Sequence, residues 1–169
     1  EEINRILADH ASDILFAPTE TACHNLANEG LGGESTYLVG DVMLDAATFY
    51  RDQARQPTFF STSTPPTDNF ILATIHRAEN TDNPERLANI LRALGEAQQR
   101  VILPLHPRTH KQIKKLGIRL APSILVTEPV GYLEMTWLEA HAHLIATDSG
   151  GVQKEAFFHG KPCITLRDE

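Results

Sequence analysis

Cysteine is scarce in this sequence of 169 residues, which contains only Cys23 and Cys163. The two thiols are far apart and neither belongs to a Cys-x-x-Cys pair, so the sequence excludes a disulfide framework and a zinc ribbon. The eight histidines form no metalloprotease motif with a neighbouring glutamate, and we expect no metal site. Free thiols are typical of a reducing compartment, which predicts a cytoplasmic protein.

Long apolar runs and basic clusters are also missing. No stretch approaches the ~20 apolar residues that a membrane-spanning helix needs, and the N-terminus has no basic-then-apolar signal segment. The formal net charge is -7, with 15 basic against 22 acidic residues, which argues against nucleic-acid binding. We therefore expect a soluble protein with neither a membrane nor a nucleic acid as partner. A hydrophobic content of 41% is enough to build one ordinary core or parts of two domains.

Short apolar runs alternate with amphipathic segments along the chain. The continuous runs predict strands that are buried on both faces, over residues 14–18, 36–40, 69–76, 100–106, 123–127, 143–148 and 162–167. Residues 83–99 predict a helix, because apolar residues recur at helical spacing after Pro84, with Asp82 or Asn83 as cap. Weaker helical patterns cover residues 19–30, 131–142 and 149–160, and another helix leads the chain.

The alternation of strands and helices predicts an α/β fold with doubly wound, Rossmann-like parallel sheets. Residues 55–69 interrupt the pattern with Ser, Thr, Pro and Asp, which is typical of a linker. We accordingly expect residues 1–57 to be the tail of an N-terminal domain, 58–68 a linker and 69–169 a second domain. The strands before the linker are too few for a complete sheet, so the first domain is expected to be truncated.

The segment TDSGG, residues 147–151, joins a predicted strand to a predicted helix. Ser149 can cap this helix, while Gly150 and Gly151 leave its first N–H groups uncovered. Such a helix start attracts phosphate, and Glu155 in the following turns can accept hydrogen bonds from sugar hydroxyls. The segment therefore favours a nucleotide diphosphate site. A plain strand-to-helix turn with a solvated Glu155 is equally compatible with the local pattern.

Two other predicted strands end in a histidine followed by basic residues. His76 and Arg77 begin HRAEN, and His106 lies in LHPRT. The carboxyl ends of parallel strands meet at one edge of a sheet, so these side chains should lie near TDSGG. A histidine can transfer protons near neutral pH and an arginine can clamp a phosphate. The alternative for HRAEN is a capped loop with an Arg77–Glu79 ion pair.

Further short motifs accompany these in a fixed order: EEINR, FAPTE, NLANEG, VGD, HRAEN, LHPRT, EPVGYLE, TDSGGVQKEA and GKPCITLRDE. Together they resemble the UDP-N-acetylglucosamine 2-epimerase family over essentially the whole chain. The resemblance implies two Rossmann-like domains that face each other across a cleft, as in glycosyltransferases of the B type. This chain would cover the middle of such a protein, and the second domain would be incomplete at its C-terminus.

The resemblance also implies roles for residues of the second domain. Ser149, Gly150 and Gly151 would bind the diphosphate of UDP, and Glu155 would accept the ribose hydroxyls. Met135 stands where the family often has an aromatic residue against the uracil, and a thioether can also pack on a base.

His76 matches the active-site histidine of the family, which would steady the leaving UDP. Glu1 matches a carboxylate that moves protons at the sugar, and Arg5 matches its neighbour in the family pattern. Locally, an ordinary surface ion pair between Glu1 and Arg5 explains EEINR as well. Arg77 and His106 match positions that touch a second UDP-N-acetylglucosamine, which acts as an activator in bacterial members.

The activity implied by the resemblance is the interconversion of UDP-N-acetylglucosamine and UDP-N-acetylmannosamine, without metal or other cofactor. UDP would be eliminated to leave a glycal and would then add back. The resemblance also implies a homodimeric protein that serves cell-surface polysaccharide biosynthesis. Three alternatives stay open: a hydrolysing epimerase that releases N-acetylmannosamine, a B-type glycosyltransferase, and a UDP-sugar binding module without turnover. The last would describe the isolated chain, because other proposed acids of the family lie upstream of it.

Overall fold

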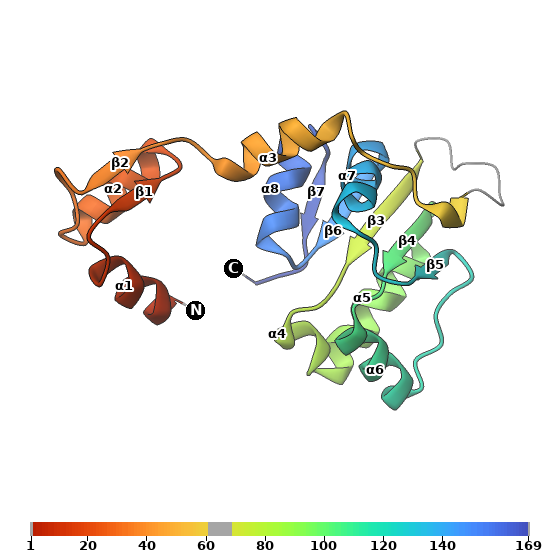
Figure 1. Cartoon of the computed structure of the whole chain (residues 1–169). Coiled ribbons are helices and arrows are strands. Elements are labelled where there is room, and N and C mark those ends of the chain that lie inside the picture. Colours follow the sequence, from red (N-terminus) through yellow and green to blue (C-terminus); the bar gives the residue numbers. More distant parts are fainter. Residues whose placement is uncertain (1, 61–68, 169) are drawn as a thin grey trace. The chain divides into compact units, whose positions relative to one another are not determined.

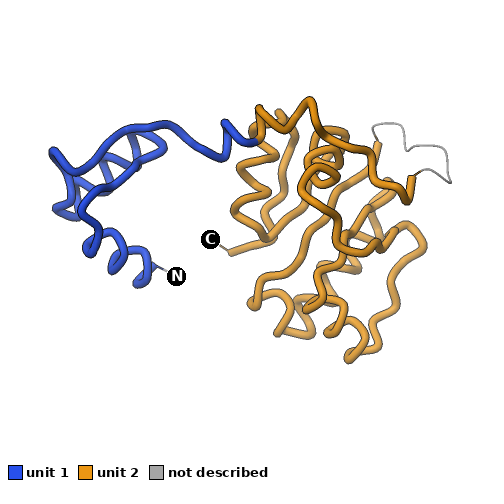
Figure 2. Tube along the Cα trace, in the orientation of Figure 1, with its two compact units in different colours: residues 1–46 blue, residues 47–169 orange. Residues whose placement is uncertain are grey.

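The computed structural model describes residues 2–60 and 69–168. The chain forms two compact units, Glu1–Ala46 and Ala47–Glu169 (Figure 2). Their boundary lies earlier than the predicted boundary at residue 57, inside helix α3 (Val42–Arg51), which the sequence patterns did not predict. The division with a linker over residues 58–68 stays a prediction, and residues 61–68 lie outside the described part of the chain.

The first unit pairs two short parallel strands with two helices. Leu15 of β1 lies opposite Thr36 of β2, and Leu15, Ala17 and Leu26 form a small buried core. Thr19 caps the second helix by accepting a hydrogen bond from the Ala22 N–H. The predicted strands and helices of this region are confirmed as α1 (Glu2–His10), β1 (Leu15–Ala17), α2 (Glu20–Asn28) and β2 (Thr36–Leu38).

The second unit is built on a five-stranded, fully parallel sheet in the order β5-β4-β3-β6-β7 (Figure 1). Every strand predicted beyond residue 69 is confirmed, as β3 (Phe70–Thr74), β4 (Arg100–Pro104), β5 (Ile124–Thr127), β6 (Leu144–Thr147) and β7 (Cys163–Thr165). The order reverses between β3 and β6, because β4 and β5 extend the sheet on one side and β6 and β7 on the other. In open parallel sheets this reversal point is where ligands bind, outside the carboxyl ends of the strands.

Both faces of the sheet are covered, which explains its uninterrupted apolar strands. Ile71 and Ala73 of β3 point into a core with α5 (Pro84–Glu96) and α6 (Pro107–Leu116). Phe70 and Leu72 point into the opposite core, with α7 (Tyr132–His141), α8 (Gly150–Phe158) and Phe60 of η1 (Thr58–Phe60). The predicted α/β, doubly wound class is therefore confirmed.

Helix starts in this unit follow ordinary capping rules. The predicted cap of α5 is confirmed as Asn83, whose side-chain oxygen accepts a hydrogen bond from the Arg86 N–H. Helix α6 was missed from the sequence, because Thr109 and Ile113 are its only buried residues and no apolar stripe marks it. It begins at Pro107 directly after His106. The short helix α4 (Ala78–Thr81) forms most of HRAEN.

Within the described ranges, no helix is both long and apolar enough to cross a membrane.

Candidate functional site

The carboxyl ends of β3 and β6 are tied together at the reversal point of the sheet. Thr74 and Thr147 are paired in register, and their hydroxyl oxygens lie 2.5 Å apart. The N–H of Ser149 donates to the Thr147 hydroxyl at 2.9 Å. These contacts fix the start of α8 relative to the end of β3.

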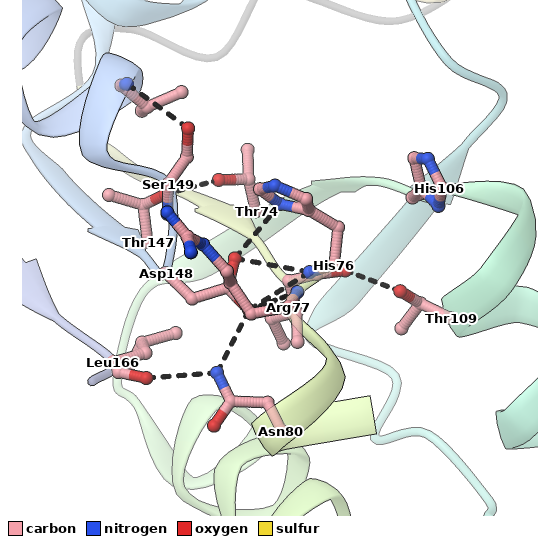
Figure 3. Close-up of polar contacts among 12 residues, drawn as sticks. Thr74, His76, Arg77, Asn80, His106, Thr109, Thr147, Asp148, Ser149 and Leu166 are labelled. Carbon is pink, nitrogen blue, oxygen red and sulfur yellow. Dashed lines mark hydrogen bonds and ion pairs between the residues drawn. The ribbon is translucent and has the colours of Figure 1, made fainter. Parts of the chain in front are cut away.

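Asp148 is a fully buried acid between these strand ends (Figure 3). Its Oδ2 accepts hydrogen bonds from the N–H of Arg77, from Asn80 Nδ2, both at 2.9 Å, and from the N–H of His76 at 3.0 Å. A carboxylate without such donors would be costly in the protein interior. Asp148 thus anchors HRAEN to TDSGG, two segments far apart in the sequence.

The His76 ring also contacts Asp148. Its Nδ1 lies 3.0 Å from Asp148 Oδ1, and the side chain is 39% exposed. A carboxylate only accepts hydrogen bonds, so the proton of this contact belongs to Nδ1. Nε2 is then the ring atom that can meet a ligand. Asp148 was missed as a site residue, although an acid at the end of a predicted strand and directly before Ser149 was a usable signal.

His106 lies beside His76 at the same edge of the sheet (Figure 3). The two ring centroids are 5.9 Å apart. His106 caps α6, because its Nδ1 accepts a hydrogen bond from the Arg108 N–H at 3.2 Å. The buried Thr109 hydroxyl donates to the Ile75 carbonyl oxygen and so fixes α6 to the residues that follow β3.

A pocket of about 280 Å³ opens at this edge. It brings together His76, His106, Met135 and Ser149, which the sequence analysis had proposed from separate motifs. An apolar wall with a few converging polar groups is typical of small-molecule sites. The full lining consists of Thr74, Ile75, His76, Pro104, His106, Pro129, Val130, Met135, Ser149 and Val152.

The N-terminus of α8 begins at the pocket. The Ser149 hydroxyl accepts a hydrogen bond from the Val152 N–H at 3.4 Å, and its own proton is free to turn toward a ligand. The first N–H groups of a helix, here those of Gly150 and Gly151, have no partner within the helix. A Cβ added at Gly150 would meet no atom within 4 Å, so the space beside it is open. This helix start can therefore receive an anion.

Glu155 lies on α8 beside two side chains of α7, Glu139 and Tyr132. Burial raises the pKa of Glu155, while hydrogen bonds with Glu139 and Tyr132 act in the opposite direction. Burial also raises the pKa of Glu139 to about 9, and the neighbouring Glu155 carboxyl adds to this rise. The sequence analysis missed Glu139, because an acid on a weakly amphipathic helix carries no local sign of burial.

The remaining predicted residues belong to the first unit. Glu1 lies outside the described residues, so the proposed Glu1–Arg5 pair stays a prediction. Arg5 forms ion pairs of 2.7 Å with Glu2, Asp9 and Glu29, which raise its pKa, chiefly through Glu2. Among the described residues of both units, no group of three or more His, Cys, Asp or Glu side chains is arranged to hold a metal ion.

Comparison with known proteins identifies the family. The family model described as UDP-N-acetylglucosamine 2-epimerase matches residues 1–169. The chain belongs to the UDP-N-acetylglucosamine 2-epimerase family. It spans about half the length of the curated relatives that it matches.

Relatives within the 2-epimerase family differ in the substrate that they are named for. The chain is 54% identical to UDP-2,3-diacetamido-2,3-dideoxy-D-glucuronate 2-epimerase of Pseudomonas aeruginosa, over 100% of this chain and 48% of that protein. It is 44% identical to UDP-N-acetylglucosamine 2-epimerase of Methanocaldococcus jannaschii, over 99% of this chain and 49% of that protein. The crystal structure of the latter with UDP-GlcNAc and UDP matches with a TM-score of 0.89, over 99% of this chain and 49% of the solved one.

Proposed function

We propose that the full-length protein is a non-hydrolysing 2-epimerase that interconverts UDP-N-acetylglucosamine and UDP-N-acetylmannosamine. The observation that carries this proposal is the His76 ring, held by buried Asp148 beside the open N-terminus of α8 in one pocket. The similarity to an archaeal enzyme solved with UDP-GlcNAc and UDP supports it.

UDP is bound by the second unit in this proposal. The N–H groups of Gly150 and Gly151 and the Ser149 hydroxyl hold the diphosphate, because a helix start offers both donors and partial positive charge. Met135 lines the pocket and packs against the uracil. Glu155, further along α8, accepts hydrogen bonds from the ribose hydroxyls.

The reaction needs an acid–base pair and a stabilised leaving group. A base, proposed as Glu1, takes the C2 proton while the C1–O bond breaks and its electron pair leaves with UDP, so that a C1=C2 double bond forms. His76 Nε2 donates a hydrogen bond to the departing diphosphate, and the N–H groups of α8 share its growing charge. UDP then adds back to C1 as C2 receives a proton on the opposite face. Every atom is returned, so we propose that neither a metal nor a redox cofactor takes part.

Proton NMR in deuterated water tests this proposal with UDP-N-acetylglucosamine as substrate. Loss of the sugar C2 proton signal together with a UDP-N-acetylmannosamine signal is the expected result. Free N-acetylmannosamine with UDP would instead mean a hydrolysing epimerase. An unchanged C2 proton would contradict epimerisation and leave sugar transfer, or binding without turnover, as the explanation of the pocket.

A second substrate is favoured by one specific finding, the 54% identity to the epimerase named for UDP-2,3-diacetamido-2,3-dideoxy-D-glucuronate. This sugar has the same C2 acetamido group and the same UDP, so the same residues of the second unit would bind and release it. The two sugars differ at C3 and C6. Comparing kcat/KM for both substrates decides between them, because a ratio of about 100 reflects ~2.7 kcal/mol of discrimination.

We also propose that a second UDP-N-acetylglucosamine activates the protein by binding near Arg77 and His106. The position of His106 at the pocket, 5.9 Å from His76, supports this. We expect the plot of rate against UDP-N-acetylglucosamine concentration to be sigmoidal for the wild type and hyperbolic for the His106→Ala variant. We further propose that the full-length protein is a homodimer, that it lies in the cytoplasm and that it serves cell-surface polysaccharide biosynthesis. The free thiols of Cys23 and Cys163 support the location in the cytoplasm, because free thiols are typical of a reducing compartment.

A further inference from the structure

Two carboxyl side chains, Glu139 of α7 and Glu155 of α8, lie beside each other in the second unit. Glu139 is 1% exposed, and among the described residues its Oε1 has no hydrogen-bond partner. Glu155 adjoins it on α8 and is only half-buried. Two adjacent charged carboxylates repel each other, and the buried one would also be deprived of water. The pair is therefore stable only when it retains a proton.

Among the described residues, the surroundings of Glu139 supply no charge that would replace this proton. His159, at the end of α8, lies nearest, but its Nε2 is 3.8 Å from Glu139 Oε2, beyond hydrogen-bond length. Burial lowers the pKa of His159, and the positive charges of Arg51 and Lys161 lower it further. His159 thus stays neutral. Tyr132, another titratable group that faces the pair, donates its hydroxyl toward Glu155.

We propose that Glu139 keeps its proton and donates a hydrogen bond to the Glu155 carboxylate, and so acts as the positioning residue for ribose recognition. This inference rests on the proposed role of Glu155 as the ribose ligand. The hydrogen bond from Glu139 fixes the rotamer of Glu155 and uses part of the acceptor sites of its carboxylate. The rest of the carboxylate is then directed at the ribose hydroxyls before UDP arrives, and its negative charge strengthens the hydrogen bonds that they donate.

The experiment measures ribose recognition separately from the rest of the ligand. Calorimetry gives the affinities of the full-length protein for UDP and for 2′,3′-dideoxy-UDP, which share uracil and diphosphate. The preference for UDP reports on the ribose hydroxyls alone. We expect a preference of about tenfold or more, corresponding to ~1.4 kcal/mol.

Two variants of Glu139 separate positioning from packing. Glu139→Gln retains a donor of the same shape, and its preference for UDP should stay within about twofold of wild type. Glu139→Met fills a similar volume without a donor, and we expect it to lose most of the preference. Its affinity for dideoxy-UDP should remain, which also demonstrates that the variant is folded.

Glu155→Ala distinguishes failure of the inference from failure of the ribose site. If Glu155→Ala removes the preference while Glu139→Met leaves it unchanged, Glu139 has no positioning role and only the inference is overturned. If Glu155→Ala also leaves the preference intact, the ribose assignment of Glu155 is wrong and the inference falls with it. Loss in Glu155→Ala and in Glu139→Met, with rescue by Glu139→Gln, supports both.

Discussion

Replacing Asp148 by Asn tests the most specific feature of the site, the buried carboxylate behind His76. The substitution preserves shape, and the amide oxygen can take the Oδ2 position and keep the donors from His76, Arg77 and Asn80. The amide nitrogen then faces His76 Nδ1, which lies 3.0 Å from Oδ1 in the native site. A donor now stands where an acceptor stood, so Nδ1 must give up its proton.

The size of the effect follows from these contacts. Hydrogen bonds to a charged group contribute about 1.5–3 kcal/mol and neutral ones about 1 kcal/mol, so weakening several of them should destabilise the fold by ~2–4 kcal/mol. Catalysis should suffer for a different reason, because the amide no longer accepts from Nδ1, and the His76 ring loses the negatively charged partner that orients it. The same change behind the histidine of serine proteases lowers kcat by about 10⁴. In our proposal the N–H groups at the start of α8 also stabilise the departing diphosphate. We therefore expect kcat to fall by a smaller factor, about 10² or more, which corresponds to ~2.7 kcal/mol.

The assay is the epimerisation rate by NMR, together with UDP affinity and urea unfolding of the same variant. The expected pattern is a large fall in kcat, with UDP affinity changed less than about fivefold. Asp82→Asn is the matched control: its carboxylate is 53% exposed and pairs with Arg108, and an exposed ion pair of this kind contributes little to stability. A folded Asp148→Asn protein with kcat near that of the control would refute the role assigned to the Asp148–His76 pair.

Further changes probe the helix start, the core and the buried acid. Ser149→Ala should weaken UDP about tenfold in calorimetry and lose ~1 kcal/mol of helix capping, whereas Ser123→Ala, away from the pocket, should leave UDP affinity unchanged. Leu138→Ala, at a fully buried position, should cost about 2–5 kcal/mol in urea unfolding; a smaller loss would mean that the core closes around the gap. The pKa of Glu139 is raised from 4.5 to about 9, so between these values the folded state binds more protons than the unfolded state. Stability should therefore fall as pH rises through this window, and a Glu139→Gln variant with the same slope would contradict this.

The strands could be predicted from the sequence because burial on both faces appears directly in composition. Strands such as Phe70–Thr74 have no polar alternation, and their apolar runs are visible without any partner. Helix α5 was visible for a similar reason, with Asn83 and Pro84 marking its start. Helix α6 was not, since its start depends on His106, a residue that rarely signals a cap, and on the distant contact between Thr109 and Ile75.

The candidate site was predictable only in part for the same physical reason. His76 and Ser149 could be placed at one edge because parallel strands all end there. Their partner Asp148 acts through main-chain N–H groups and Asn80, which belong to another segment. A local pattern contains no information on which donors a distant loop will supply. The family motifs contain these residues, but the motifs alone do not say what each contacts.

The two buried carboxyls illustrate how far charge depends on tertiary structure. Asp148 and Glu139 are both essentially inaccessible to solvent, yet one is surrounded by donors and the other adjoins a second acid. Asp148 can therefore act as an acceptor behind His76, the group that in our proposal donates to the diphosphate. Glu139, by our proposal, acts as a donor behind Glu155, the group that accepts from the ribose. In this proposal each ligand-binding side chain is oriented by a buried partner of the opposite hydrogen-bonding role. Replacing the two partners by isosteric amides should therefore have opposite consequences: loss of function at Asp148 and tolerance at Glu139.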